Sequence, residues 1–201
     1  MLNIYLLRHG ETQWNADGNK YCGRTDIPLT NKGIDQANQV YGQFHGMGFD
    51  KVYSSPLRRA SETAKIASGT NDVILDDRLI EVDFGHWEGK TKEEFIPENE
   101  ALWLNWELHP ETTRAGESGE TAGEVIQRVD DFFSSISEKH SDGETVLVVA
   151  HNGINRLYMA HKLGMPLNAY RKIFQENSRI TLFTLDELGN FQLKLLNSRG
   201  I

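Results

Sequence analysis

The sequence predicts a three-layer α/β/α fold with a mainly parallel sheet, helices on both faces of the sheet and a helical cover. Two short apolar runs, Leu2–Leu7 and Thr145–Ala150, each lead into a histidine and then a glycine. Such runs are typical of buried strands in a parallel sheet. Amphipathic helical patterns lie between them, and residues 83–123 combine tryptophans and charges without a strand pattern, which predicts the cover.

Composition predicts one domain over residues 1–201, long enough to bury a substantial core. The net charge of −8 and the lack of a basic run argue against a nucleic-acid partner, so a cationic pocket would need its own explanation. The single cysteine, Cys22, excludes an internal disulfide and fits a reducing compartment. No run resembles a signal peptide or a membrane span. We therefore expect a cytoplasmic protein with no membrane partner.

The first half of the chain predicts strands that alternate with helices. The polar stretch 11–28 predicts a loop over the sheet edge, and Thr30 predicts the N-cap of the helix that follows. A short strand is expected at 52–53. After it, Ser55 predicts an N-cap with Pro56 at the first helical position.

A third strand is expected at 73–75, and the cover follows over residues 83–123. Capping-box spacing occurs twice, at Thr91–Glu94 and at Thr121–Glu124, and the second box opens a strongly amphipathic helix. Packing within the cover, rather than stacking on a substrate, is the predicted role of three tryptophans: Trp87, Trp103 and Trp106.

The last third of the chain predicts a strand, a helix and a hairpin. The strand Thr145–Ala150 ends at His151, and the helix after it stops at Gly164. The segments 180–185 and 191–196 predict an antiparallel pair that completes the sheet.

Polar residues follow the predicted parallel strands. Arg8 and His9 end the first strand and His151 ends a later one, and open parallel sheets bind ligands at their carboxyl edge. Arg58 falls in a first helical turn, where the helix dipole disfavours a cation, so a bound anion is expected to compensate there. Its neighbour Arg59 is expected to reach solvent instead.

Two arginines and two histidines at one edge indicate phosphoryl chemistry. Arginine binds phosphate oxygens in a bidentate manner and stays charged, and a neutral imidazole can act as the nucleophile. The leaving oxygen then needs a general acid, for which the residues offer Glu81 or Asp83. A carboxyl shielded by the cover could keep its proton near neutral pH.

The motif Arg8–Thr12, which reads Arg-His-Gly-Glu-Thr, resembles the signature of the histidine phosphatase superfamily, also called the phosphoglycerate-mutase-like family. The resemblance continues in the family's order over nearly the whole chain, through Trp14–Asn15, Asp26–Thr30 with Gly33, Ser54–Arg58, Glu81–Gly89, Gly116–Ser118 and Val149–Gly153. It implies a phosphoglycerate-mutase-like fold.

The resemblance also implies roles for individual residues. His9 would be phosphorylated, and Arg8, Arg58 and His151 would hold the phosphate. Of the two open carboxyls, the resemblance selects Glu81 as the proton donor. Asn15 would be a further phosphate contact. Cys22 and Gly23 are expected to line the pocket rim or to pack beneath it, and Asn152 is expected to contact the substrate or its phosphate.

The chain departs from the mutases of this family at two positions. Val82 and Phe84 stand where mutases generally have an Arg and a Tyr that read the substrate, and the insertion before His151 is shorter. The chain is thus more similar to the phosphatase branch, which includes alpha-ribazole, phosphoserine and broad-specificity phosphatases. The predicted function is metal-independent hydrolysis of small-molecule phosphate monoesters. A phosphoglycerate mutase and an inactive phospho-ligand-binding protein remain the alternatives.

We expect no metal and no organic cofactor, because the remaining histidines show no metal-ligand spacing. Arg24 is the loop cation expected to touch the substrate, whereas Arg128 and Arg156 are expected to be structural ion-pair partners. A homodimer is left open.

Overall fold

The structure is a computed structural model that describes residues 1–200. It contains a six-stranded sheet with the strand order β3-β2-β4-β1-β5-β6. The strands are β1 (Leu2–Arg8), β2 (Lys51–Ser54), β3 (Ile74–Leu75), β4 (Thr145–Ala150), β5 (Ile180–Leu185) and β6 (Phe191–Ser198). The strands β1 to β4 pair in parallel, and β5 and β6 add an antiparallel edge. The predicted mainly parallel sheet and the closing hairpin are both confirmed.

The pairing of β1 with β4 determines where the site forms. Arg8 lies opposite Ala150, so the next residue of each strand, His9 and His151, leaves the sheet at the same level. The His9 N–H donates to the Ala150 carbonyl at 3.0 Å, which extends the ladder by one more bond. The two predicted histidines are therefore brought together by strand register alone.

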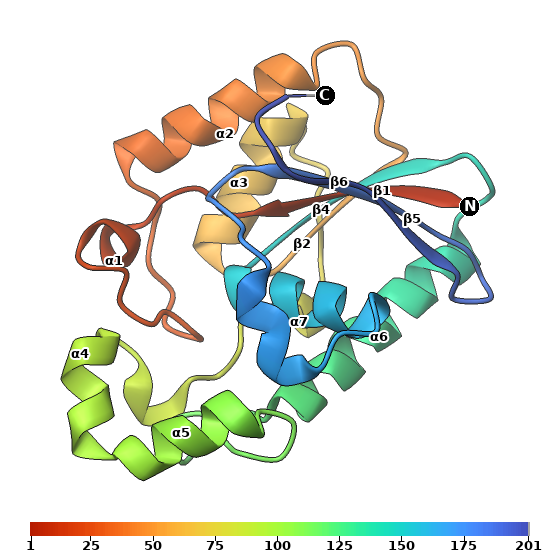
Figure 1. The fold of residues 1–201 in the computed structure, drawn as a ribbon. Helices are drawn as coiled ribbons and strands as arrows, with labels where there is room; N and C mark the ends of the chain where they lie inside the picture. Colours follow the sequence, from red (N-terminus) through yellow and green to blue (C-terminus); the bar gives the residue numbers. More distant parts are fainter. Residues whose placement is uncertain (201) are drawn as a thin grey trace.

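Helices cover both faces of this sheet (Figure 1), as the continuous apolar runs of a doubly covered sheet require. On one face lie α2 (Asn31–Gln43) and α3 (Arg58–Ser68), packed against Leu147 and Val149 of β4. On the other face lie α6 (Ala122–Lys139) and α7 (Asn152–Lys162), with a larger core that includes Val148. The three-layer prediction is confirmed.

The segment 83–121 forms short helices at the end of the molecule opposite the N-terminus, below α1 (Gln13–Ala16) in Figure 1. These helices are η2 (Gly85–Trp87), α4 (Lys92–Phe95), η3 (Ile96–Glu98) and α5 (Glu100–Leu108), and two more 3-10 helices lie elsewhere, η1 (Asp77–Leu79) and η4 (Leu167–Lys172). Both predicted capping boxes form. The Trp87 ring stacks on Phe95 at 4.9 Å, and Trp103 and Trp106 are buried beside them. The predicted packing role of the tryptophans is confirmed.

The predicted start of α3 is wrong by two residues. The helix begins at Arg58, and its N-cap is Leu57, whose side chain cannot cap. The Ser55 hydroxyl instead accepts the N–H of Leu57 at 3.3 Å, and the Asp26 carboxylate accepts the N–H of Arg58 at 2.8 Å. A carboxylate from the distant loop thus supplies the cap, which local sequence cannot reveal.

Within residues 1–200, no helix has both the length and the apolar character needed to span a membrane.

Candidate active site

The site forms where β1 and β4 end. The rings of His9 and His151 lie 5.2 Å apart between centroids, and both side chains are buried. Their closeness follows from the shared register of the two strands, so neither histidine depends on a mobile loop for its position.

The tautomer of His9 is fixed by its own neighbour. Its Nδ1 lies 2.7 Å from the Gly10 carbonyl oxygen, which can only accept, so Nδ1 carries the hydrogen and donates it. The lone pair then remains on Nε2. Burial, with the charges of Arg59 and Arg8, holds the pKa of His9 well below its usual range. His9 is therefore a neutral imidazole, which is the form that can attack phosphorus.

His151 is a second neutral imidazole. It is fully buried, and burial followed by the charge of Arg59 holds its pKa well below the usual range. Neither ring nitrogen has a hydrogen-bond partner in the part of the chain that the structure describes. Because unpaired buried polar atoms are costly, these nitrogens are poised to meet an incoming ligand.

Arg8 places a charged guanidinium beside the two rings. One terminal nitrogen, Nη1, donates to the Gln175 carbonyl at 3.1 Å. Burial lowers the pKa of Arg8 to about 10, so the group is still a cation at neutral pH.

The structure reverses the predicted placement of the two adjacent arginines, Arg58 and Arg59. Arg58 is exposed, whereas Arg59 is 0% exposed. Arg59 donates to the carbonyls of Thr25 and Gly23 at 2.8 and 2.7 Å. The reason for the error is the helix start: each residue turns a helix by about 100°, so a shift of the cap changes which neighbouring side chain faces the interior.

Glu81 lies at the N-terminus of α7 and is 4% exposed. Its carboxyl oxygens accept the N–H groups of Val82, Gly153 and Ile154 at 2.9–3.0 Å. Burial nevertheless raises the pKa of Glu81 above its usual value. The other candidate for the general acid, the Asp83 carboxylate, accepts the N–H of Gly85 at 2.9 Å and does not line the cavity. The geometry therefore favours Glu81 as the proton donor.

A cavity of about 440 Å³ is lined by Arg8, His9 and Glu81, whereas His151 and Arg59 do not form part of its wall. Asn15, Cys22 and Asn152 line it, as predicted for the rim. Gly23 is not in its wall but packs beneath, where a Cβ would overlap the Val82 carbonyl and the Glu88 carboxylate. Burial raises the pKa of the Cys22 thiol to about 11, so it is not a thiolate nucleophile.

Sequence reasoning missed the segment between η4 and β5. The Asn177 side chain donates to the His9 carbonyl at 2.9 Å and to Asn15 Oδ1 at 3.3 Å, and the N–H of Ser178 donates to the Arg8 carbonyl at 3.0 Å. These bonds fix the backbone that carries His9. No local motif marks them, because the segment reaches the site only through the antiparallel return of β5 beside β1.

For the other three arginines, the structure contradicts two predictions and confirms one. Arg24 pairs with Glu120 at 3.1 Å and lies outside the cavity. Arg128 also binds Glu120, at 2.9 Å, which confirms its structural role. Arg156, however, lines the cavity, and no carboxylate of residues 1–200 lies within ion-pair distance of it.

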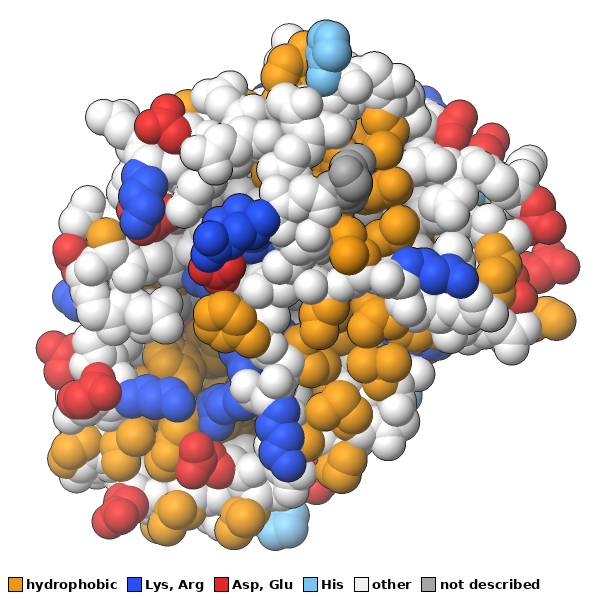
Figure 2. Space-filling view, turned by 45° about the horizontal axis from the view of Figure 1, so that its top comes forward, with side chains coloured by type: hydrophobic (Ala, Val, Ile, Leu, Met, Phe, Trp, Pro, Cys, Tyr) orange, Lys and Arg blue, Asp and Glu red, His pale blue; other side chains and the backbone are white. Residues whose placement is uncertain are grey.

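The wall of the cavity is rich in Lys and Arg. Its lining includes five cations and two acids: Arg8, Lys20, Lys92, Arg156 and Arg171 with Glu81 and Glu93. In Figure 2 several Lys and Arg side chains lie around a hollow in the lower left of the face shown. This is a cationic site in a protein with a net charge of −8.

Among residues 1–200, no group of three or more His, Cys, Asp or Glu side chains is placed to hold a metal ion.

Comparison with known proteins places these features in context. The family description "Histidine phosphatase superfamily (branch 1)" matches residues 4–199. An adenosylcobalamin/alpha-ribazole phosphatase of Escherichia coli is 36% identical, with 100% of this chain and 98% of that protein covered. A probable phosphoglycerate mutase of Enterobacter sp. is 33% identical, with 93% and 86% covered.

The fold is also found among solved structures. A phosphoserine phosphatase mutant from Entamoeba histolytica, solved in complex with phosphoserine, has a TM-score of 0.88 to this chain and 31% identity. The alignment covers 99% of this chain and 98% of that one.

Proposed function

The chain belongs to the histidine phosphatase superfamily, and we propose that it hydrolyses small-molecule phosphate monoesters through a phosphohistidine on His9, without a metal. The observation that carries this proposal is the fixed tautomer of His9. Its Nδ1–H is held by the Gly10 carbonyl, and its free Nε2 belongs to a neutral ring next to His151. A buried neutral imidazole surrounded by arginine charge suits nucleophilic attack on a phosphoryl group.

In the first step, His9 Nε2 attacks phosphorus, an N–P bond forms and the P–O bond to the alcohol breaks. Glu81 gives its proton to the departing oxygen, so the alcohol leaves neutral. Arg8 and Arg59 balance the charge on the phosphoryl oxygens, and the ring N–H of His151 donates to one of them. The Nδ1–H bond to Gly10 persists throughout, because only Nε2 changes its bonding.

In the second step, the ionised Glu81 takes a proton from water, and the water oxygen attacks phosphorus. The N–P bond breaks, its electron pair returns to Nε2, and inorganic phosphate leaves. Glu81 ends protonated and His9 neutral, which closes the cycle. The backbone N–H groups at the α7 N-terminus support this carboxyl when it is ionised, while burial supports its protonated form.

Hydrolysis is favoured over mutase activity by the side chains at two positions. Val82 is buried and Phe84 lines the cavity, where mutases of the family generally place an Arg and a Tyr. These two apolar side chains cannot make the polar substrate contacts that the Arg and Tyr make at these positions in the mutases.

The test is phosphate release from a panel of monoesters with a chelator present, with 3-phosphoglycerate also scored for conversion into 2-phosphoglycerate. We expect release that resists the chelator and no interconversion. Efficient interconversion with little free phosphate would assign a mutase. Absence of both reactions would leave a phospho-ligand-binding protein.

Glu81→Gln is expected to slow poor leaving groups much more than good ones, because glutamine cannot supply a proton. We expect kcat to fall by about 10²- to 10⁴-fold for an alkyl phosphate and much less for p-nitrophenyl phosphate. The measurement is kcat for the two substrates in both proteins. Equal losses on both substrates would contradict the role of general acid.

The protonation of Glu81 should also make the turnover depend on pH. Because burial raises the pKa of Glu81, the acid form persists closer to neutral pH, and turnover of an alkyl phosphate falls as the pH rises through that pKa. This limb is expected to be absent from the pH profile of Glu81→Gln.

A further inference from the structure

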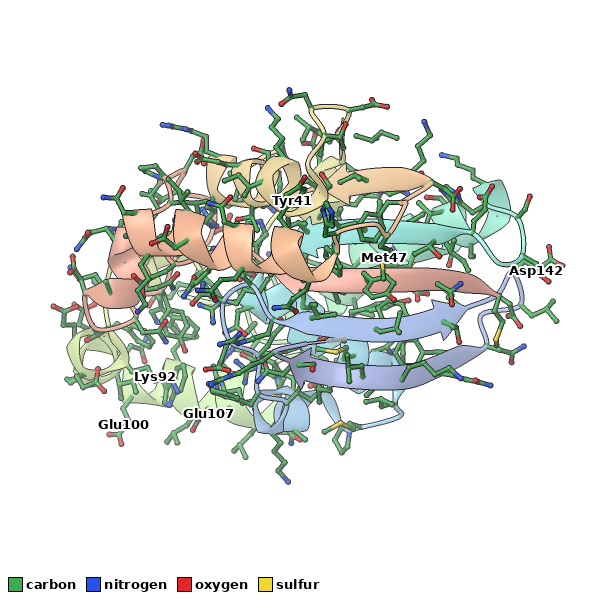
Figure 3. The ribbon with its side chains drawn as sticks, turned by 90° about the horizontal axis from the view of Figure 1, so that it is seen from above. Tyr41, Met47, Lys92, Glu100, Glu107 and Asp142 are labelled. Atoms are coloured by element: carbon green, nitrogen blue, oxygen red, sulfur yellow. The ribbon has the colours of Figure 1, made fainter. Side chains whose placement is uncertain are left out.

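Four cations that line the cavity have no role in the mechanism above: Lys20, Lys92, Arg156 and Arg171. We name the three that lie against aromatic rings, Lys92, Arg156 and Arg171, the cation collar. They come from three separate elements, α4, α7 and η4, and all three line the cavity. Figure 3 shows Lys92 on the cover, near Glu107 and at the end of the molecule opposite Asp142. Three segments far apart in the sequence thus bring positive charge to the wall of one cavity.

The collar is held in place by aromatic rings more than by acids. The guanidinium of Arg171 lies 4.5 Å from the ring centre of Trp103, and the Lys92 ammonium lies 4.8 Å from the same ring. Arg156 lies 5.2 Å from the ring centre of Tyr170. Such cation–π contacts fix a side chain without consuming its charge.

Few carboxylates neutralise the collar. Arg171 has an ion pair with Glu107 at 3.4 Å. Arg156 and Lys92 have none within residues 1–200, and the Arg156 Nε contacts only the Tyr170 carbonyl, at 3.4 Å.

The collar cations also repel one another. Burial and the charges of Arg171 and Arg156 lower the pKa of Lys92, and burial with Arg171 lowers that of Arg156. Keeping like charges together in a partly buried site costs free energy, and a bound anion would recover it.

We propose that the cation collar is a second anion subsite, which binds a carboxylate of the substrate while the phosphate lies against His9. This inference rests on the proposed function and names its substrate class: phosphate monoesters that also carry a carboxylate. Arg156 lines the same cavity as Arg8 and Glu81 and interacts electrostatically with both. Its charge contributes to lowering the pKa of Arg8, and the charge of Glu81 acts to raise the pKa of Arg156. The guanidinium groups of Arg156 and Arg171 offer the planar paired donors that match a carboxylate.

The collar also bears on the two positions that depart from the mutases. Val82 and Phe84 remove one cation and one hydroxyl from the segment after Glu81. The collar restores positive charge from other elements, at a different place on the cavity wall. Recognition of a doubly anionic substrate is therefore retained without the mutase geometry.

The first test measures binding, which does not require turnover. The probes are 2-amino-4-phosphonobutyrate and 3-aminopropylphosphonate, which differ only by the carboxylate and cannot be hydrolysed. We expect calorimetry on the whole chain to give at least about tenfold tighter binding for the carboxylate, as expected for a charge-assisted hydrogen bond. Arg156→Gln should remove most of this ratio, and Arg156→Lys should restore part of it.

Matched controls separate the collar from general loss of charge. Lys90 and Arg114 pair with Glu98 and Glu124 and do not line the cavity. Lys90→Gln and Arg114→Gln should leave the ratio within about twofold, whereas Lys92→Gln should lower it. Equal binding of the two phosphonates to the wild type would overturn the subsite. Tighter binding of propane-1,3-diphosphonate than of the carboxylate probe would overturn the carboxylate and assign a second phosphate.

The second test compares kcat/KM for phosphoserine and phosphoethanolamine, which differ by the same carboxylate. We expect a preference of about tenfold or more for phosphoserine, which is lost in Arg156→Gln and kept in the control variants Lys90→Gln and Arg114→Gln. Hydrolysis of both esters at one rate would refute the subsite and keep the phosphatase. Carboxylate-dependent binding without any phosphate release would keep the subsite and refute the phosphatase.

Discussion

His9→Ala is expected to lower kcat/KM by about 10⁴-fold or more on every monoester, because removal of a covalent nucleophile removes the reaction path itself. No neighbouring group replaces it: the Cys22 thiol has its pKa raised to about 11, and the proposed role of His151 is to hold phosphate. The measurements are steady-state turnover and the amount of labelled phosphoryl group that stays on the enzyme after denaturation. Denaturation is done without acid, because phosphohistidine is labile to acid. The wild type should carry label and the variant none.

Two further variants make this result interpretable. His9→Asn keeps a side-chain N–H that can reach the Gly10 carbonyl, so it tests chemistry with less change in packing. His161→Ala changes an exposed histidine on α7 and should leave turnover within about twofold. Label retained in His9→Asn, or activity within tenfold of wild type, would show that another residue accepts the phosphoryl group.

The fold could be predicted from the sequence because its signals are local. Buried runs of four to eight apolar residues, capping boxes and amphipathic helices follow from short-range periodicity, and these elements lie close to their expected ranges. The positions of the two histidines could be predicted equally well from the sequence. A strand followed by His and Gly occurs twice, and parallel register alone then places His9 beside His151.

The parts that could not be predicted depend on contacts between distant segments. Asp26 caps α3 across 32 residues of sequence, and Asn177 reaches the His9 carbonyl across 168. Arg156 looks like any helical arginine in the sequence, because the cavity that it lines is built from elements before and after it. Local rules therefore find the strands and the two histidines at their ends, but they cannot tell which of two adjacent arginines turns inward.

Arg59→Ala is the second large effect. We expect a fall of about 10²- to 10³-fold in kcat/KM, as for the loss of one preorganised donor to a developing oxyanion. The charge of Arg59 reaches His9, His151 and Glu81, and lowers the pKa of each of them. Arg58→Ala is the matched control, since its side chain is exposed, and it should change kcat/KM by less than about twofold.

Arg59 also holds the loop that carries Cys22, so its removal could act through structure alone. Its two terminal nitrogens bind the carbonyls of Gly23 and Thr25, while the Glu88 carboxylate accepts the N–H groups of Arg24 and Thr25 from the other side of that loop.

Arg59→Lys separates the two roles, because it keeps the charge and loses the fork. If the main role of Arg59 is to place a positive charge beside the phosphoryl group, inhibition by vanadate should survive in Arg59→Lys and weaken in Arg59→Ala. The two variants should then have similar melting temperatures. If both variants lose vanadate binding together with thermal stability, the arginine acts by bracing the loop, and the phosphate is held by Arg8 and His151 alone. A large loss in Arg58→Ala instead would contradict the inward placement of Arg59.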